Sequence, residues 1–200
     1  MDPEPILRHR ILLAILLSFN ATAGAEEPKR WVAGPYSFSD ELGGFRITSA
    51  SGIGVKEDPI VIVQELTSAS AVTLVIRAEN PGTPSDDPHK FATGMLRIRL
   101  DTLNNSGQGW TEFEFELQEV LGQASVFSDG LSFDQRRDDG TSIESDSFAE
   151  FSRAFEPYDR LRFTKGQVDP LHAASFEFRI TDFTPRPTFY LVQDPRIPFS

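Results

Sequence analysis

An acidic segment between residues 134 and 146 holds the residue types best suited to metal chemistry. Ca²⁺ prefers carboxylate and other oxygen ligands. An EF-hand loop is excluded, because placing Gly140 at its sixth position puts Arg137 at the third, where an oxygen ligand is required. A calcium site of another kind remains open, and its candidate ligands are Asp134, Asp138, Asp139, Glu144 and Asp146. A second, smaller acidic loop contains Asp86, Asp87 and His89.

Residues able to act as nucleophiles or bases are few. The chain has no cysteine, which excludes thiolate nucleophiles, thiolate metal sites and iron–sulfur clusters. Only His89 and His172 follow the first 25 residues, and neither a G-x-S-x-G nor an H-E-x-x-H motif occurs. The Gly52-Ile-Gly54 segment lacks the spacing of a phosphate loop and predicts a hairpin turn. We therefore expect no catalytic residue and no cofactor, with calcium the one open candidate.

Three glutamates, Glu112, Glu114 and Glu116, alternate with apolar residues. Carboxylates two apart on a strand lie roughly 6–7 Å from each other, a separation compatible with two-carboxylate glycosidase chemistry. Nearly every Glu-x-Glu strand meets that criterion, so the pattern primarily indicates a solvated sheet face. Sugar binding would instead need stacking aromatic rings, for which the candidates are Trp31, Tyr36, Trp110, Tyr158 and Tyr190.

The elements that position these residues are mainly strands. Strict alternation of apolar and polar residues, typical of half-buried antiparallel strands, runs through 96–100, 111–117 and 176–180. Other predicted strands are 45–48, 59–66, 72–77, 125–127, 161–164 and 188–192. If 96–100 and 111–117 pair as a hairpin, Arg97 and Arg99 face the three glutamates.

One short helix is predicted at about 147–156. Ser147 and Glu150 have the spacing of a capping box, and Pro157 would end the helix. Its apolar stripe would consist of Phe148, Phe151 and Phe155. We expect this stripe to cover one end of the core, with a partner-binding face as the alternative.

Strands separated by turns predict an all-β fold, an antiparallel β-sandwich or jelly-roll-like domain with that one helix. Seventeen phenylalanines suit the facing inner sides of two sheets. Residues 26–200 are the length of a single domain, and the Pro-containing tail, 194–200, is predicted to be loose.

Residues 1–25 have the pattern of a signal peptide. Arg8 and Arg10 precede an apolar run from Ile11 to Phe19, and Ala23-Gly24-Ala25 provides small residues before a cleavage site at Glu26. The run is shorter than the about 20 residues that span a bilayer, so we expect no membrane insertion after cleavage. The absence of cysteine favours a bacterial exported protein, periplasmic or secreted.

The net charge of −11 repels the phosphates of nucleic acids and anionic lipids. We therefore expect no nucleic-acid partner. The favoured hypothesis is an exported, non-enzymatic β-sandwich protein that binds a protein or cell-envelope component. The alternatives are a carbohydrate-binding module and then a carboxylate-dependent hydrolase.

Overall fold

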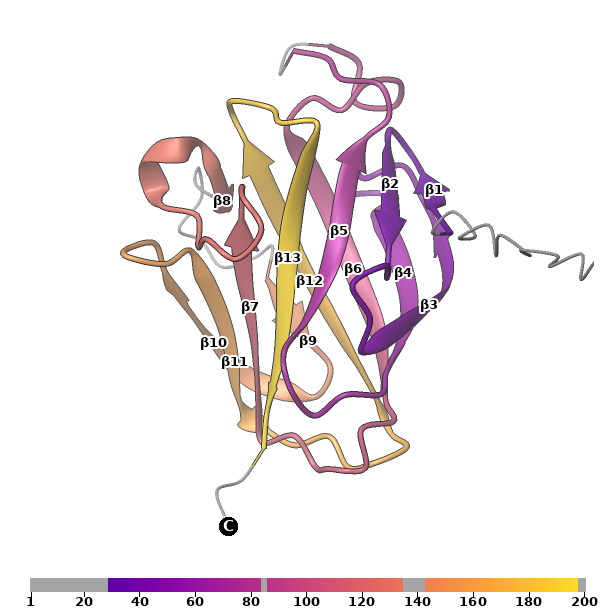
Figure 1. Ribbon diagram of the computed structural model, residues 1–200, viewed down its shortest axis with the longest axis vertical. Coiled ribbons are helices and arrows are strands. Elements are labelled where there is room, and N and C mark those ends of the chain that lie inside the picture. Colours follow the sequence, from indigo (N-terminus) through magenta and orange to yellow (C-terminus); the bar gives the residue numbers. More distant parts are fainter. Residues whose placement is uncertain (1–28, 84–85, 135–142, 198–200) are drawn as a thin grey trace, which may run out of the picture.

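A computed structural model describes residues 29–83, 86–134 and 143–197. In this part of the chain, strands form two sheets that pack face to face (Figure 1). The predicted all-β sandwich is thereby confirmed. The predicted signal peptide, residues 1–25, lies outside the described residues.

Sheet A has seven strands in the order β1-β2-β5-β13-β7-β11-β10, and every neighbouring pair is antiparallel. Its strands are β1 (Trp31–Ala33), β2 (Tyr36–Ser39), β5 (Val72–Ala78), β13 (Thr188–Arg196), β7 (Glu112–Gln118), β11 (Arg160–Gly166) and β10 (Phe148–Ala154).

Sheet B has the order β3-β4-β6-β12-β8, and the short strand β9 also pairs with β12. Strands β4 and β6 run parallel, while the other neighbours are antiparallel. Its strands are β3 (Phe45–Ser51), β4 (Ile60–Leu66), β6 (Met95–Asn104), β12 (Ala173–Asp182), β8 (Leu131–Phe133) and β9 (Glu144–Ser145). A 3₁₀ turn, η1 (Phe127–Asp129), precedes β8.

Phenylalanines from facing strands form the centre of the core. The rings of Phe113 on β7 and Phe176 on β12 lie 4.6 Å apart, and those of Phe115 and Phe178 lie 4.9 Å apart. All four side chains are fully buried. Alternation along each strand sends these residues inward and their charged neighbours outward, so the predicted inward orientation is confirmed.

The predicted hairpin between 96–100 and 111–117 is wrong. Strand β6 pairs with β4 and β12 in sheet B, whereas β7 lies between β11 and β13 in sheet A. The connection crosses between sheets at Trp110, which is buried and whose backbone bonds to Val168. Arginines from neighbouring strands therefore bind the glutamates, in the pairs Arg162–Glu112, Arg196–Glu114 at 2.9 Å and Arg160–Glu116 at 2.6 Å.

The predicted helix at 147–156 is also wrong, because residues 148–154 form β10 at the edge of sheet A. The Ser147 hydroxyl donates to the Asp146 carboxylate at 2.8 Å instead of capping a helix. Phe148 and Phe151 nevertheless both pack against the core. On β11, Lys165 has a φ of 60° and lies between Thr164 and Gly166, the partners of Glu150 and Phe148.

Two shorter expectations are corrected as well. Residues 125–127, predicted as a strand, lead into η1, because the Asp129 carboxylate accepts hydrogen bonds from the Ser125 hydroxyl at 2.6 Å and the Val126 amide at 3.0 Å. The tail predicted to be loose from residue 194 continues β13 to Arg196, which pairs with Glu112 of β7.

Candidate functional site

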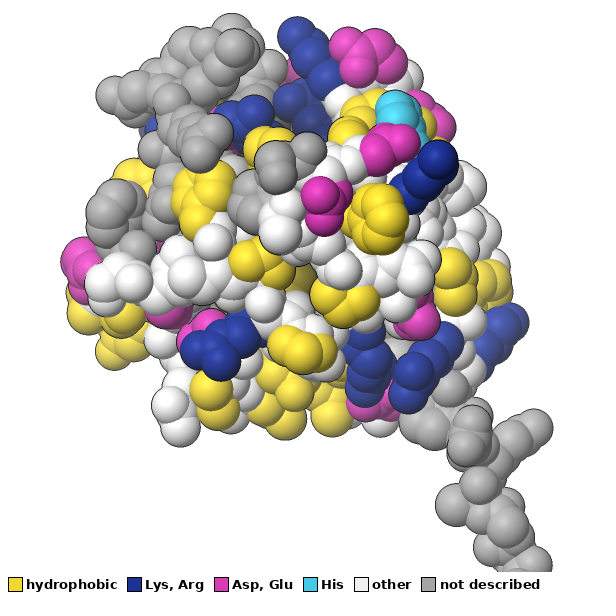
Figure 2. All heavy atoms as spheres, turned by 90° about the horizontal axis from the view of Figure 1, so that it is seen from above, with side chains coloured by type: hydrophobic (Ala, Val, Ile, Leu, Met, Phe, Trp, Pro, Cys, Tyr) yellow, Lys and Arg dark blue, Asp and Glu magenta, His cyan; other side chains and the backbone are white. Residues whose placement is uncertain are grey.

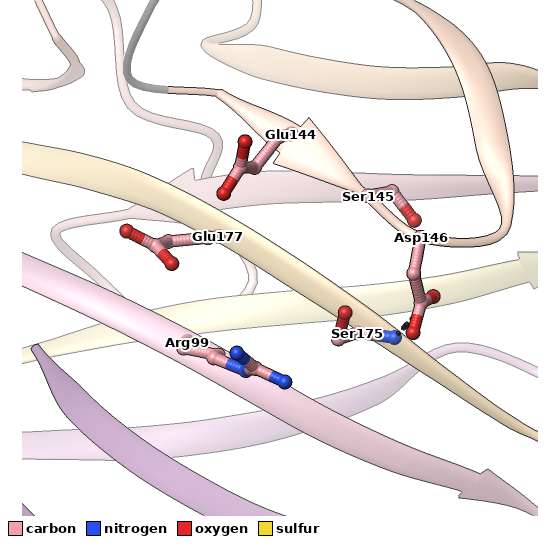
Figure 3. Close-up of a pocket in the computed structure, with 6 residues that line it drawn as sticks. All are labelled: Arg99, Glu144, Ser145, Asp146, Ser175 and Glu177. Atoms are coloured by element: carbon pink, nitrogen blue, oxygen red, sulfur yellow. Dashed lines mark hydrogen bonds between the residues drawn. The ribbon is translucent and has the colours of Figure 1, made fainter.

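A polar hollow of about 260 Å³ lies on the outer side of sheet B (Figure 3). We call it the β9 pocket. Its lining combines one guanidinium, three carboxylates and two hydroxyls, from Arg99, Glu144, Ser145, Asp146, Ser175 and Glu177.

Strand register brings these residues together. Glu177 on β12 is paired with Arg99 on β6 and with Glu144 on β9, so the three occupy one row across three strands. Their chain neighbours Leu100 and Phe176 are fully buried. Alternation therefore places the row on the solvent side, with successive strands about 4.8 Å apart. Figure 3 shows Glu144 and Glu177 at one end of the pocket and Asp146 with Ser175 at the other.

Two charged groups of the pocket, those of Glu177 and Arg99, already form hydrogen bonds with other residues of sheet B. Arg97 donates through Nε to Oε1 of Glu177 at 2.7 Å, and Arg99 donates through Nε to Oδ1 of Asp101 at 2.8 Å. The Asp101 hydrogen bond raises the pKa of Arg99. Among the described residues, no hydrogen-bond partner is found for Oε2 of Glu177, the Arg99 Nη atoms or the Glu144 carboxylate.

Asp146 has a different environment. Burial opposes its ionisation, but hydrogen bonds from the Ser175 amide and the Ser147 hydroxyl, both at 2.8 Å, and the nearby charge of Arg99 outweigh that effect. The pKa of Asp146 is therefore lowered. Its carboxylate is ionised at neutral pH and holds β9 against β12.

Known proteins give no further guide to this site. No family model, curated protein or solved structure matches the chain. Among the described residues, no helix is long and apolar enough to cross a membrane.

The structure separates the calcium candidates. Glu144 and Asp146 line the β9 pocket, whereas Asp134 is buried and forms an ion pair with Arg179. Asp138 and Asp139 lie outside the described residues. Within residues 29–83, 86–134 and 143–197, no three acidic or histidine side chains are grouped to hold a metal ion. Calcium binding by the whole 134–146 segment stays a prediction.

The second acidic loop uses its carboxylates to hold its own backbone. Asp86 accepts a hydrogen bond from the Thr83 amide at 2.7 Å, and Asp87 accepts one from the His89 amide at 2.9 Å. His172 is exposed at the turn before β12, with Nδ1 3.3 Å from the Pro170 carbonyl. Asp86, Asp87 and His172 thus make contacts with residues two or three positions away in their own loops.

The five candidate sugar-stacking residues do not share one surface. Trp110 and Tyr36 are buried in the core. The Trp31 ring lies under Lys29, with the ammonium 3.7 Å from the ring centroid, and the Tyr158 ring lies under Arg160. Tyr190 is on β13, the central strand of sheet A, whereas Trp31 is on the edge strand β1. The predicted platform is therefore not formed by this set.

Sequence reasoning missed Arg99, Ser175 and Glu177 as pocket residues. Their only signal was alternation, which placed them on the outer face of their strands. The pairing of β6 with β12, and of β12 with β9, joins positions more than 30 residues apart, and such non-local pairing has no short-range motif.

Proposed function

We propose that this chain is an exported, non-enzymatic binding protein that recognises a protein or cell-envelope component through the β9 pocket. The observation that carries this proposal is a hollow lined by charged groups, some of whose donor and acceptor atoms have no partner among the residues that the structure describes. Ligand sites typically combine such a concave surface with a few fixed polar groups.

A second hollow, of about 320 Å³, is a weaker candidate for a ligand site than the β9 pocket. It is lined by Glu119, Val120, Arg186, Pro187 and Thr188. Its two charged residues, Glu119 and Arg186, form an ion pair with each other. Their charges are therefore already neutralised, whereas Glu144 in the β9 pocket is not paired among the described residues.

Apolar recognition has less support. The exposed large hydrophobic residues come from separate turns and strands, for example Val32, Leu42, Phe91, Val120 and Leu171. At the upper end of the sandwich, hydrophobic side chains are interspersed with charged and polar ones (Figure 2). Recognition of a partner by complementary charge is the better fit to this surface.

The two alternatives fit the geometry less well. A carbohydrate-binding module would use stacking rings, and Trp110 and Tyr36 are buried. A carboxylate-dependent hydrolase needs a general acid with a raised pKa, and the pKa of Asp146 in the pocket is lowered.

Co-sedimentation with isolated cell-envelope fractions of a Gram-negative host tests the proposal. Residues 26–200 should bind, and Ser175→Tyr, whose ring would fill the pocket from the same face as Glu177, should abolish most of the binding. Ser152→Tyr on β10 is the matched control, because Ser152 is exposed in the other sheet. Wild-type binding by Ser175→Tyr would contradict the proposal, and so would release of soluble fragments from the envelope fraction, which would indicate an enzyme.

A further inference from the structure

Two glutamates of the β9 pocket stand directly opposite each other. Glu144 and Glu177 are paired across β9 and β12, which places their Cβ atoms about 4.5–5.5 Å apart. Like charges in this position repel. Arg97 neutralises Glu177 through Oε1, but Glu144 has no partner among the described residues. A ligand cation between Glu144 and Oε2 of Glu177 would remove this repulsion.

An ammonium group suits the position better than a metal ion. Ca²⁺ takes six to eight oxygen ligands, and the described residues contain no group of three acidic or histidine side chains suited to a metal. Arg99, in the same row, adds a positive charge that opposes a divalent cation. An ammonium carries a single charge and donates three hydrogen bonds, which Glu144, Glu177 and a pocket hydroxyl can accept.

Arg99 supplies the complementary end of the site. Its Nε is used by Asp101, while its Nη atoms have no partner among the described residues. A guanidinium binds a carboxylate with fixed, fork-like geometry. Arg99 and Glu144 are two strand spacings apart, about 10 Å between α-carbons, and both side chains line the hollow between them.

From this row of charges we propose that the β9 pocket binds an ammonium group and a carboxylate group presented together, as by a lysine at the C-terminus of a partner protein. The inference rests on the binding role proposed for the pocket. The side-chain ammonium lies between Glu144 and Glu177, and the terminal carboxylate lies on Arg99.

Three peptides that differ by one group test the ligand class. They are acetyl-Gly-Gly-Lys with a free carboxylate, the same peptide amidated at its C-terminus, and the same peptide acetylated on the lysine side chain. In NMR titrations of ¹⁵N-labelled residues 26–200, the first should shift the amides of β9 and the facing part of β12. Each of the other two should bind about two- to fivefold more weakly, the value of one exposed charge pair. Free 6-aminohexanoate binding more tightly than the first peptide would contradict a protein terminus as the source.

Two pocket variants test which charged group of the ligand each pocket residue binds. Arg99→Gln should remove the preference for the free carboxylate over the amide, and Glu144→Gln should reduce the preference for lysine over acetyl-lysine. Arg46→Gln and Glu150→Gln are matched controls with the same charge changes at exposed positions outside the pocket, and they should keep both preferences. Equal binding of the three peptides to the wild type, or preferences that survive the pocket variants, would overturn the inference. If Ser175→Tyr still abolishes envelope binding in that case, the binding role stands and only the ligand class fails.

Discussion

Asp159, just before β11, is a carboxyl group in the interior of the protein. Its side chain is fully buried, and its backbone bonds to Ser125 and Leu117, each at 3.1 Å. Burial raises its pKa to about 7, and the charge of Asp129 adds to the rise. The Ser132 hydroxyl and the Phe133 amide are near enough to oppose the rise, but neither makes a well-formed hydrogen bond with the carboxyl oxygens. The folded protein therefore holds this proton to near neutral pH.

This proton predicts a pH dependence of stability. The unfolded chain loses it near pH 3.9, so the contribution of Asp159 to stability falls as the pH rises from about 4 to 7 and is constant above. Asp159→Asn cannot ionise. Its free energy of unfolding relative to the wild type should rise by about 2–3 kcal/mol between pH 5 and pH 8, measured by urea unfolding. Glu150→Gln, an exposed control, should show no such change, and an equally flat difference for Asp159→Asn would refute the assignment.

Phe115 is the residue at which core packing is best tested. Its ring lies 4.9–6.0 Å from the rings of Phe178, Phe176 and Phe163. Phe115→Ala should lower the free energy of unfolding by about 3–5 kcal/mol, and the exposed Glu144→Ala should stay within about 0.5 kcal/mol. Alternation alone would suggest Glu114 as the exposed control, but Glu114 is 8 % exposed and bound by Arg196 at 2.9 Å. A loss for Phe115→Ala in urea no larger than that for Glu144→Ala would mean that Phe115 does not face the core.

At the scale of elements, β10 shows how tertiary contacts override a local signal. The spacing of Ser147, Glu150 and the phenylalanines favours a helix, but pairing with β11 supplies the backbone hydrogen bonds from Phe148↔Gly166 to Ala154↔Arg160. Both structures can bury Phe148 and Phe151. The strand also completes the edge of sheet A, which a short isolated helix could not do.

Two substitutions at Ser152 distinguish a strand at residues 148–154 from a helix. Ser152 is exposed on β10 and pairs with Arg162. In a strand, Ser152→Val should be more stable than Ser152→Ala, by up to about 1 kcal/mol, because branched side chains fit a pleated surface. In a helix the order reverses, since alanine has the highest helix propensity. Urea midpoints of the two variants give the order, and a more stable alanine variant would argue for the helix.

At the scale of the whole molecule, two sheets share one core and carry their charges outward. Ion pairs between neighbouring strands, such as Arg97–Glu177 and Arg160–Glu116, neutralise part of the outer faces. The excess of carboxylates that gives the chain its charge of −11 remains available for solubility and for attracting cationic groups. The proposed ammonium ligand is consistent with this balance.

Export is expected of the chain as a whole. Expressed with its own leader in a Gram-negative host, the protein should appear in the periplasm or medium with Glu26 as its first residue, because the small residues before Glu26 suit signal peptidase. Amino-terminal sequencing or intact mass measures this. A cytoplasmic or membrane-bound product that begins at Met1 would contradict it.

Local patterning is enough to predict the sandwich and the inner faces of its main strands. A period of two is a local property, and burial of one face is its direct consequence, so alternation alone places Phe113, Phe115, Phe176 and Phe178 in the core, where all four are buried. The same rule placed Arg99 and Glu177 on outer faces without indicating that they adjoin.

Contacts between distant parts of the chain set the strand partners. They assigned β6 and β7 to different sheets, made residues 148–154 a strand and extended β13 to Arg196. They also joined β6, β12 and β9 into the β9 pocket. The physical reason is that pairing energy comes from strands distant in the chain, and local propensities of a few tenths of a kcal/mol per residue are too small to fix it.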